Sequence, residues 1–462
     1  MAEFSTSTRL TPLDLLMPPT YIRVLFTFRT TESSISPIKR LQDALDRVSE
    51  TIPWLSGHVF ASAATTGQAP GLEIRYRSDD SRPVLVDKGT IEASYETLSL
   101  EGLLPDTIPD HVWPAPPMID QDLSAKGAPV FGASFFQFAD SHGVGLCICM
   151  HHSAIDATGF TDIVRLWAQH TAGLTPSYTT HNSDRRARLL NVLQSDLEKI
   201  SSTTTESLFE LHPEYSKIPP SFPTEFPACS CKLFELSVMH INAYKERLKG
   251  CMSGAPSTNA VVCALIWSAI TRARMQRSPA LVRESSRLAM AVNGQRRLGT
   301  EFSSPGNPYL GNTILYSLAC SPTSDLDSCP ESPESFAKIR DMIGQSQSHK
   351  KINTSHVAEV YSLVERKEDY RSIFVGWDLF SSRDLTITSW ADLDFYGMEF
   401  GMELGRPEFT RIAGSTADGI GIVMPRKGES GGSKEVVEIM IMLRSDDMGV
   451  LEEDTIWKNF TA

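Results

Sequence analysis

The sequence predicts a mixed α/β protein built from two halves. Strand-like stretches alternate irregularly with stretches of helical period, and no internal repeat or low-complexity tract interrupts them. The chain has 462 residues, more than one hydrophobic core usually serves. Residues Tyr178 to Ser221 are polar, lose their period and end in a proline-rich run. We therefore expect an N-terminal lobe over residues 1–200, a crossover linker over 201–224 and a C-terminal lobe over 225–462.

Composition and charge narrow the classes of partner. The chain is 41% hydrophobic and 21% charged, as in ordinary globular proteins, and its net charge is −13. That charge argues against nucleic acid or an anionic membrane as the main partner. Glu3 stands where a secretory signal would carry positive charge, and no apolar run is long enough to cross a bilayer. We expect a soluble, cytoplasmic monomer that acts on small molecules.

The N-terminal half predicts a helix and a hairpin. Residues Ser36 to Glu50 have the pattern of a capped helix, with Ser36 suited to the N-cap and Pro37 to the first turn. Apolar runs from Pro129 to Phe138 and from Gly143 to Met150 flank a short polar turn, which is typical of a hairpin. The second of these strands leads directly into the most informative segment of the chain.

The C-terminal half predicts further helices and strands. The longest helix begins near Ser257, a plausible N-cap, and has a broad apolar face. The other expected elements are, in chain order, a strand over Cys231–Val238, a helix over His240–Lys249, a strand over Arg287–Asn293, helices over Ser335–Lys350 and Ser355–Glu365, and paired strands over Gly419–Pro425 and Glu435–Leu443.

The segment from His151 to Gly159, with the sequence HHSAIDATG, joins an apolar strand to a helical pattern. It places histidine at the end of a strand, an acid four residues later and a glycine at the start of a helix. Histidine is the side chain best suited to move a proton near neutral pH, and the acid can hold the loop in shape. The segment therefore predicts an enzyme that deprotonates an acceptor group.

The spacing alone does not prove this role, because a histidine that merely caps a strand end is about equally compatible with it. Strand residues alternate faces, so His151 and His152 should not both face one cleft. Spacing does not say which of them does. We favour His152 as the catalytic residue because it lies nearer the turn and Asp156.

Other catalytic patterns fail on their context. Gly428 to Gly432 nearly matches a nucleophile elbow around Ser430, but it lies in a polar turn between strands. No phosphate loop or dinucleotide fingerprint occurs, and the cysteine pairs lack zinc spacing, so no metal is expected. The remaining histidines are isolated in sequence and receive no role: His58, His111, His142, His170, His181, His212, His240, His349 and His356.

The segment from His151 to Gly159 closely resembles the HHxxxDxxG signature of the BAHD family of CoA-dependent acyltransferases and of related condensation domains. Other segments resemble further family elements in the right order over nearly the whole chain. They are Leu10–Asp14 (LTPLD), Ile52–Gly57 (IPWLSG), Ser257–Asn259 with Ala264–Trp267 and Thr271–Arg274, Asn293–Arg297 (NGQRR), Tyr309–Asn312 (YLGN) and Thr388–Trp390 (TSW). The detailed pattern resembles the fungal branch that modifies secondary metabolites.

Two departures from the family pattern stand out. The usual DFGWG loop appears as Glu399-Phe400-Gly401-Met402-Glu403, a change in an element with an architectural role in the family. Gln295 stands where the arginine-rich element often has its first arginine. Arg297 or Arg296 would then have to pair with Asp156.

The resemblance implies two lobes like chloramphenicol acetyltransferase subunits with a channel between them, and residues near 380–400 that pack back onto the N-terminal sheet. It implies that His152 is the general base and that Asp156 gives structural support through an arginine. Trp390 or Thr388 would stabilise the oxyanion, and Ser257 and Thr258 would contact CoA. Gly159, Arg296, Arg297 and Gly401 would be structural.

The function implied is transfer of an acyl group, acetyl foremost, from acyl-CoA to a hydroxyl of a fungal terpenoid, polyketide or alkaloid. Acyl-CoA would be a co-substrate, with no permanently bound cofactor. The alternatives are an N-acyltransferase, a free-standing condensation-type enzyme that takes its acyl group from a carrier protein, and a non-catalytic binding homologue. An intact His152, Asp156 and Gly159 argue against the last of these.

Overall fold

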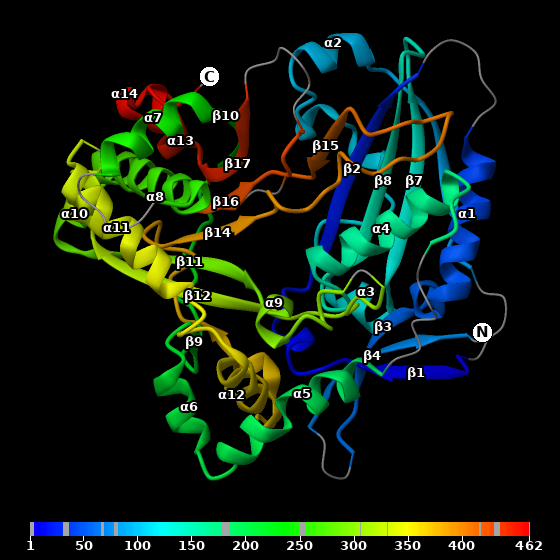
Figure 1. Cartoon of the computed structure of the whole chain (residues 1–462), viewed down its shortest axis with the longest axis horizontal. Helices are drawn as coiled ribbons and strands as arrows, with labels where there is room; N and C mark the ends of the chain where they lie inside the picture. The colour runs from blue at the N-terminus through cyan, green and yellow to red at the C-terminus, as the bar shows by residue number, and fades with distance from the viewer. Residues whose placement is uncertain are drawn as a thin grey trace.

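The computed structural model describes residues 4–30, 37–65, 69–77, 82–176, 184–249, 256–304, 306–329, 331–414, 417–428 and 435–461. Two lobes lie side by side, each with a large sheet and covering helices (Figure 1). The predicted mixed α/β fold with two lobes is therefore confirmed. Within these residues, no helix is both long and apolar enough to cross a membrane.

The N-terminal lobe is centred on a five-stranded sheet with the order β15-β2-β8-β7-β5. Its middle strand β8 is buried along its whole length, which explains its almost entirely apolar sequence. β7 and β8 form the hairpin that the sequence predicts. The strands are β15 (Phe409–Ile412), β2 (Tyr21–Arg29), β8 (Gly143–His151), β7 (Phe131–Phe138) and β5 (Leu85–Ile91).

Two helices, α1 (Ile38–Thr51) and α4 (Ala157–Thr171), pack together on this sheet (Figure 1). The indole N–H of Trp167 in α4 donates to the carbonyl of Leu41 in α1 at 2.9 Å. The predicted helix near residues 36–50 is confirmed, although Ser36, its expected cap, lies outside the described residues. A smaller sheet beside it contains β1 (Thr6–Arg9), β4 (Gly71–Tyr76), β3 (His58–Ser62) and β6 (Ala128–Pro129).

The C-terminal lobe has a six-stranded sheet with the order β10-β17-β16-β14-β11-β12. Helix α8 (Thr258–Arg277) lies between this sheet and other helices, so its side chains are buried almost all round. The predicted helix from Ser257 is thereby confirmed. The strands are β10 (Cys229–Ser237), β17 (Val436–Arg444), β16 (Ile420–Val423), β14 (Leu385–Ser389), β11 (Ser285–Asn293) and β12 (Ile314–Pro322).

The helices around α8 follow its length on the outer side of the lobe (Figure 1). They are α7 (Val238–Leu248), α10 (Thr323–Asp327), α11 (Pro333–Ser346), α13 (Ser445–Glu453) and α14 (Thr455–Lys458). Short helices elsewhere are α2 (Tyr95–Leu100), α3 (Gln121–Lys126) and α9 (Gln295–Leu298), with single 3₁₀ turns at Asp14–Leu16, Pro53–Ser56, Pro105–Thr107, Asp110–Val112, Pro279–Arg283 and Tyr370–Ser372.

The crossover between the lobes is more ordered than the sequence indicates. It contains α5 (Arg185–Lys199) and α6 (Thr205–Leu211), which pack with α12 (Thr354–Glu365) below the lobes in Figure 1. Their apolar side chains form a hydrophobic cluster apart from the cores of the two lobes, called here the third hydrophobic cluster. Only Leu189 and Leu193 of α5 have fully buried apolar side chains. A stripe this narrow is hard to recognise in a polar sequence. A two-stranded ribbon, β9 (Tyr215–Ser216) and β13 (Phe374–Val375), completes the cluster.

Residues near 380–400, which were expected on the N-terminal sheet, divide between the lobes. β14 (Leu385–Ser389) is an inner strand of the C-terminal sheet. Phe395 and Phe400 pack on Phe26 and Phe28 of β2, and the chain then reaches β15, which pairs with β2. The strand-forming Leu385–Ser389 therefore belongs to one lobe and the loop that follows it to the other.

Candidate active site

The segment from His151 to Gly159 lies where the two lobes meet. β8 ends at His151 and α4 begins at Ala157, so the loop between them leaves the N-terminal sheet and turns at once into a helix. From the C-terminal lobe, the residues just before β12 reach this loop. The Nδ2 of Asn312 donates to the carbonyl of His152 at 2.9 Å, and the backbone N–H of Thr313 donates to Asp156 at 3.2 Å.

His152 is the first residue after β8, and its side chain is partly exposed. Its backbone N–H donates to the carbonyl of Thr20 at 2.9 Å, which fixes the loop against the start of β2. Burial lowers the pKa of His152 below its usual range, and nearby backbone groups and the Asn312 amide act in the opposite direction only in part. The imidazole is therefore neutral near pH 7 and able to accept a proton.

His151 is a packing residue. Its side chain is buried, its ring lies edge-on to the ring of Tyr21, and its Nδ1 accepts the N–H of Ser153 at 3.1 Å. Burial, and to a smaller degree the neighbouring His152, lowers its pKa to about 3. One of its two nitrogens is thus occupied as an acceptor within its own loop. The two histidines differ in their surroundings, as the alternation of strand residues predicts.

Asp156 is fully buried and serves as the N-cap of α4. One carboxylate oxygen accepts the N–H of Gly159 at 3.0 Å, and the other accepts the N–H of Thr313. Burial raises its pKa to about 7, and these two hydrogen bonds offset the effect in part. The predicted ion pair with Arg296 or Arg297 is wrong: the carboxylate oxygens of Asp156 are taken by backbone N–H groups instead.

Both arginines point elsewhere. The guanidinium of Arg296 is exposed and lies 3.4 Å from Asp392, whereas Arg297 donates to the carbonyl of Gln347 at 2.9 Å. Gln295, which stands at the expected arginine position, is buried and donates to the carbonyl of Tyr309 at 3.0 Å. A neutral amide at this position leaves no cation directed at Asp156. Backbone N–H groups have replaced the ion pair.

A buried polar network that the sequence did not predict supports the loop from behind. Asp14 is fully buried, and one of its oxygens accepts both the N–H of Asn312 at 2.8 Å and its Nδ2 at 3.0 Å. Its other oxygen accepts the N–H and the hydroxyl of Thr11 and lies 3.6 Å from the guanidinium of Arg185, which also donates to the carbonyl of Ala154. The LTPLD and YLGN segments therefore meet directly beneath His152.

The expected oxyanion donors come from the central strand of the other lobe. Thr388 lies in β14, paired with Ile422, and is half-buried. Trp390 follows the strand, is buried, and packs its ring near Phe395 in the same hydrophobic cluster as Ala154 and Ile155 of the loop. Through Phe395, whose ring packs on Phe26 and Phe160, Trp390 belongs to a hydrophobic core to which both lobes contribute.

Gly159 and Gly401 both allow close approaches of backbone. A Cβ at Gly159 would lie 2.7 Å from the side chain of Ile155 and 3.6 Å from the Cα of Leu310. Gly401 has a φ of +87°, which favours glycine, and a Cβ there would lie 3.2 Å from the carbonyl oxygen of Thr171 at the end of α4. Phe400 packs on Phe28. The altered loop over residues 399–403 thus fastens the returning chain to the N-terminal lobe.

Ser257 and Thr258 begin α8. The hydroxyl of Ser257 accepts the N–H of Ala260 at 3.2 Å, so Ser257 is the N-cap of the helix. The hydroxyl of Thr258 accepts from the ammonium of Lys245 at 3.2 Å, a contact for which the sequence offered no signal. A helix N-terminus with an adjacent cation is a favourable place for an anionic group.

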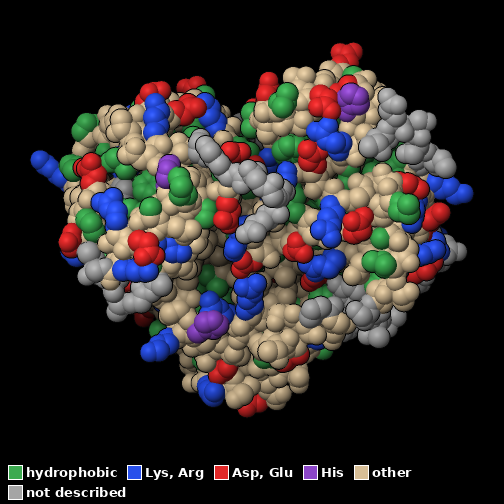
Figure 2. All heavy atoms as spheres, turned by 45° about the horizontal axis from the view of Figure 1, so that its top comes forward, with side chains coloured by type: hydrophobic (Ala, Val, Ile, Leu, Met, Phe, Trp, Pro, Cys, Tyr) green, Lys and Arg blue, Asp and Glu red, His purple; other side chains and the backbone are tan. Residues whose placement is uncertain are grey.

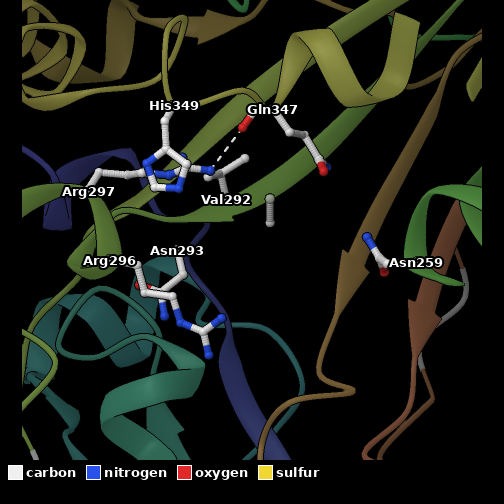
Figure 3. Close-up of a pocket in the computed structure, with 8 residues that line it drawn as sticks. Asn259, Val292, Asn293, Arg296, Arg297, Gln347 and His349 are labelled. Carbon is white, nitrogen blue, oxygen red and sulfur yellow. Dashed lines mark hydrogen bonds between the residues drawn. The ribbon is translucent and has the colours of Figure 1, made fainter. Parts of the chain in front are cut away.

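A cavity of about 240 Å³ opens beside this helix start (Figure 3). Arg296, Arg297 and His349 approach it from one side, and Asn259 in the first turn of α8 faces it from the other. One guanidinium nitrogen of Arg297, Nη1, is buried without a hydrogen-bond partner among the described residues. In the space-filling view a hollow opens between the lobes, with charged side chains on its rim (Figure 2). The cavity is positively charged and could bind an anion.

Comparison with known proteins places this arrangement in a family. The Transferase family matches residues 98–456, and the trichothecene 3-O-acetyltransferase-like N-terminal domain matches residues 20–170. The chain is 26% identical to an O-acetyltransferase of Penicillium ochrochloron, over 98% of this chain and 96% of that protein. It is 24% identical to the trichothecene 8-O-acetyltransferase of Fusarium sporotrichioides, over 96% of each chain.

Among solved structures, the fold is similar to that of TRI101 from F. graminearum, crystallised with coenzyme A and T-2 mycotoxin. The TM-score is 0.78 at 18% sequence identity, over 99% of both chains. This likeness extends over both lobes. The family match covers most of the chain, including the HHxxxDxxG segment. The chain therefore belongs to the Transferase family and is an acyl-CoA-dependent acyltransferase of the fungal BAHD type.

Proposed function

We propose that this enzyme transfers an acetyl group from acetyl-CoA to a hydroxyl group of a fungal secondary metabolite. The observation that carries the proposal is the environment of His152. It is a partly exposed histidine whose pKa is lowered by burial, at the junction of the lobes and held by an amide from the opposite lobe. The relatives described above are O-acetyltransferases by name, which supports this acyl group and this kind of acceptor.

The chemistry assigned to His152 is general-base catalysis. The neutral imidazole removes the proton of the acceptor hydroxyl while the oxygen attacks the thioester carbonyl of acetyl-CoA. A C–O bond forms and the carbonyl oxygen gains negative charge. When the tetrahedral intermediate collapses, the C–S bond breaks, and the imidazolium returns its proton to the CoA thiolate. The products are the acetyl ester and free CoA, and His152 is regenerated.

The negative charge on the carbonyl oxygen needs a positioned donor. We assign this role to the indole N–H of Trp390 or to the hydroxyl of Thr388. Support comes from the position of Trp390, which packs in the same hydrophobic cluster as Ala154 and Ile155 of the catalytic loop. Donors of this type typically contribute 10²–10³-fold to the rate of acyl transfer.

The acyl donor is assigned to the start of α8 and the adjacent cavity. Thr258, its partner Lys245 and the helix N-terminus would meet phosphate groups, as would Arg297 across the cavity. Ser257 already caps the helix, so it would contact CoA mainly through the helix start that it stabilises. The solved relative contains coenzyme A, which supports a CoA site in this fold.

Direct transfer is favoured because the described residues offer no activated nucleophile. Burial raises the pKa of the Cys149 and Cys263 thiols to about 12 and that of Cys147 well above its usual range. Thiols in this state are poor nucleophiles. Ser430, the centre of the nucleophile-elbow letters, lies outside the described residues.

The test is release of free thiol from acetyl-CoA in the presence of a panel of hydroxylated terpenoids, polyketides and alkaloids, with amines as a separate arm. The proposal expects thiol release and a product heavier by one acetyl group with at least one hydroxylated compound. Transfer only to amines would replace the ester product by an amide. Transfer only from an acyl-loaded carrier protein, with acetyl-CoA inert, would overturn the assignment of the donor.

A further inference from the structure

A second cluster of titratable side chains lies away from the catalytic loop, in the hydrophobic cluster formed by α5, α6 and α12. It contains His212 and Glu214, between α6 and β9, and His356 and Glu359 on α12. His212 and His356 received no role in the sequence analysis because they are isolated along the chain, but the fold brings them together. They are 144 positions apart, yet their rings lie 4.6 Å apart in an edge-to-face arrangement.

Three potential ligand atoms converge in this cluster. Glu214 Oε1 lies 3.0 Å from His212 Nδ1 and 3.3 Å from His356 Nε2, and all three ligand atoms lie within 4.8 Å of one another. Nitrogen and oxygen ligands bound tetrahedrally to zinc at 2.0–2.1 Å are about 3.4 Å apart. The two distances from Glu214 lie close to this value, and the separation between the two histidine nitrogens, which is within 4.8 Å, would have to approach it when a metal binds.

The tautomer of His212 suits metal binding. Its Nδ1 lies 3.0 Å from Glu214 Oε1 and its Nε2 lies 3.0 Å from Glu359 Oε2. An Nε2–H can donate to Glu359 while the Nδ1 lone pair faces a metal held together with Glu214. Histidines that bind metals almost always donate their other N–H to a carboxylate or carbonyl in this way. Glu359 would therefore orient His212 without binding the metal itself.

His356 supplies an independent observation. Its side chain is 8% exposed, and its Nε2 is buried without a hydrogen-bond partner among the described residues. This nitrogen lies 3.3 Å from the oxygen of Glu214 that also contacts His212, but without the alignment of a hydrogen bond. A buried ring nitrogen without a hydrogen bond is costly unless another group satisfies it.

The three ligand atoms come from two parts of the chain. His212 and Glu214 lie in the crossover between α6 and β9, and His356 lies on α12. A cation bound by all three would join these two parts. We propose that His212, Glu214 and His356 form a structural zinc site that ties the crossover between the lobes to α12.

Zinc is the metal of choice because two imidazoles and one carboxylate form a mixed nitrogen and oxygen set, whereas calcium and magnesium require oxygen ligands. A fourth position remains for the second oxygen of Glu214 or for water. The proposal is independent of the acyl-transfer mechanism, since none of its residues is assigned a role in catalysis. It predicts a gain in stability for the third hydrophobic cluster.

The experiment uses the full chain, expressed without a polyhistidine tag in zinc-supplemented medium. Elemental analysis should find about one zinc per chain, and removal with a strong chelator should lower the melting temperature. His356→Asn should lose the zinc and melt like the chelated wild type. His240→Asn is the matched control, because His240 is exposed at the start of α7, and it should retain the metal.

A second measurement does not depend on the folding of the His356 variant. Metal-free wild type titrated with Co²⁺ should develop the visible bands of a tetrahedral complex, and Glu214→Gln should weaken them at least tenfold in affinity. Wild-type protein that binds neither zinc nor cobalt would overturn the proposal. Zinc retained equally by His356→Asn and Glu214→Gln would do the same.

Discussion

His152 and Asp156 stand four positions apart, and burial affects them in opposite directions. It keeps His152 neutral by lowering its pKa, and it raises the pKa of Asp156 to about 7 because a fully buried carboxylate is poorly solvated. Two backbone N–H groups, one from each lobe, partly compensate for the lost solvation of Asp156. The catalytic loop is therefore held by a group that is itself sensitive to pH.

This sensitivity gives a stability prediction. Folded Asp156, with a pKa of about 7 against an ordinary 3.8, binds more protons than the unfolded chain between these values, so its contribution to the free energy of unfolding falls as pH rises through this window. Asp156→Asn cannot titrate. In urea unfolding, the free energy of unfolding of this variant should fall further below that of wild type at about pH 5 than at about pH 8. An equal deficit in the free energy of unfolding at both pH values would mean that Asp156 is ionised throughout this range.

Asn312 is a positioning residue for His152, because its Nδ2 donates to the His152 carbonyl and to Asp14. Asn312→Ala should cost about 1–3 kcal/mol of stability by leaving buried acceptors unpaired, and it should lower kcat more than it raises KM. Asn312→Asp keeps the shape but cannot donate, so it should fail in the same way. Asn307→Ala, at an exposed position, is the control. Unchanged kcat in both Asn312 variants would remove it from the site.

At this scale, the sequence predicted where the catalytic loop lies but not its supports. The HHxxxDxxG segment offered two histidines, and His152 is the proposed base because it lies nearer the turn and because of the family resemblance. Asp14 and Asn312 are 298 positions apart, and nothing local shows that one side chain donates to the other. The arginine expected at Asp156 was wrong for a related reason: the N–H that takes its place belongs to Thr313, 157 positions away in the sequence.

Among the elements, the connection from β11 into α9 contains a close approach of two backbone segments. The N–H of Gly294 donates to the carbonyl of Thr313 at 2.9 Å, and a Cβ at Gly294 would lie 2.2 Å from the same oxygen. Thr313 in turn donates to Asp156. Two hydrogen bonds of Thr313 therefore connect this turn of the C-terminal lobe to the catalytic loop.

Gly294→Ala should consequently destabilise the protein by about 1–3 kcal/mol or more, because the clash is with backbone that cannot rotate away. Gly344→Ala is the matched control: Gly344 is exposed in α11, and a Cβ there meets nothing within 4 Å. That change should be neutral or stabilise the helix by about 0.5–1 kcal/mol. Equal melting temperatures for the two variants would show that the turn at Gly294 can adjust.

Most elements with a wide apolar face were predictable. β8 and α8 are buried nearly all round, and their sequences are correspondingly apolar. α5 was missed because it buries only a narrow stripe. The division of residues 380–400 was also missed: β14 joins the C-terminal sheet, whereas Phe395 packs on Phe26 of the N-terminal sheet. In both cases the apolar pattern reports burial but not the surface against which the element is buried.

For the whole molecule, the proposed site draws on both lobes. His152 lies on one side, and Asn312, Thr388 and the start of α8 belong to the other. In the proposed mechanism both substrates are present between the lobes when the proton moves. No covalent acyl-enzyme is needed in this arrangement.

The expected kinetic order follows from direct transfer. Varying acetyl-CoA and acceptor together should give intersecting double-reciprocal plots, because both substrates bind before either product leaves. Incubation with acetyl-CoA alone should leave the mass of the protein unchanged in mass spectrometry. Parallel plots, or a trapped acetyl adduct on any side chain, would reveal a nucleophile in the pathway.

The central claim is that His152 is the base, and paired alanine variants test it most directly. His152→Ala should lower the rate of thiol release roughly 10²–10⁴-fold, with a melting temperature close to that of wild type. His151→Ala should mainly lower the melting temperature, because His151 is buried against Tyr21. In wild type, kcat/KM should decrease on the acid side only below pH 6.5, because burial lowers the pKa of His152 from that value. Near-wild-type turnover by a folded His152→Ala variant would contradict the account.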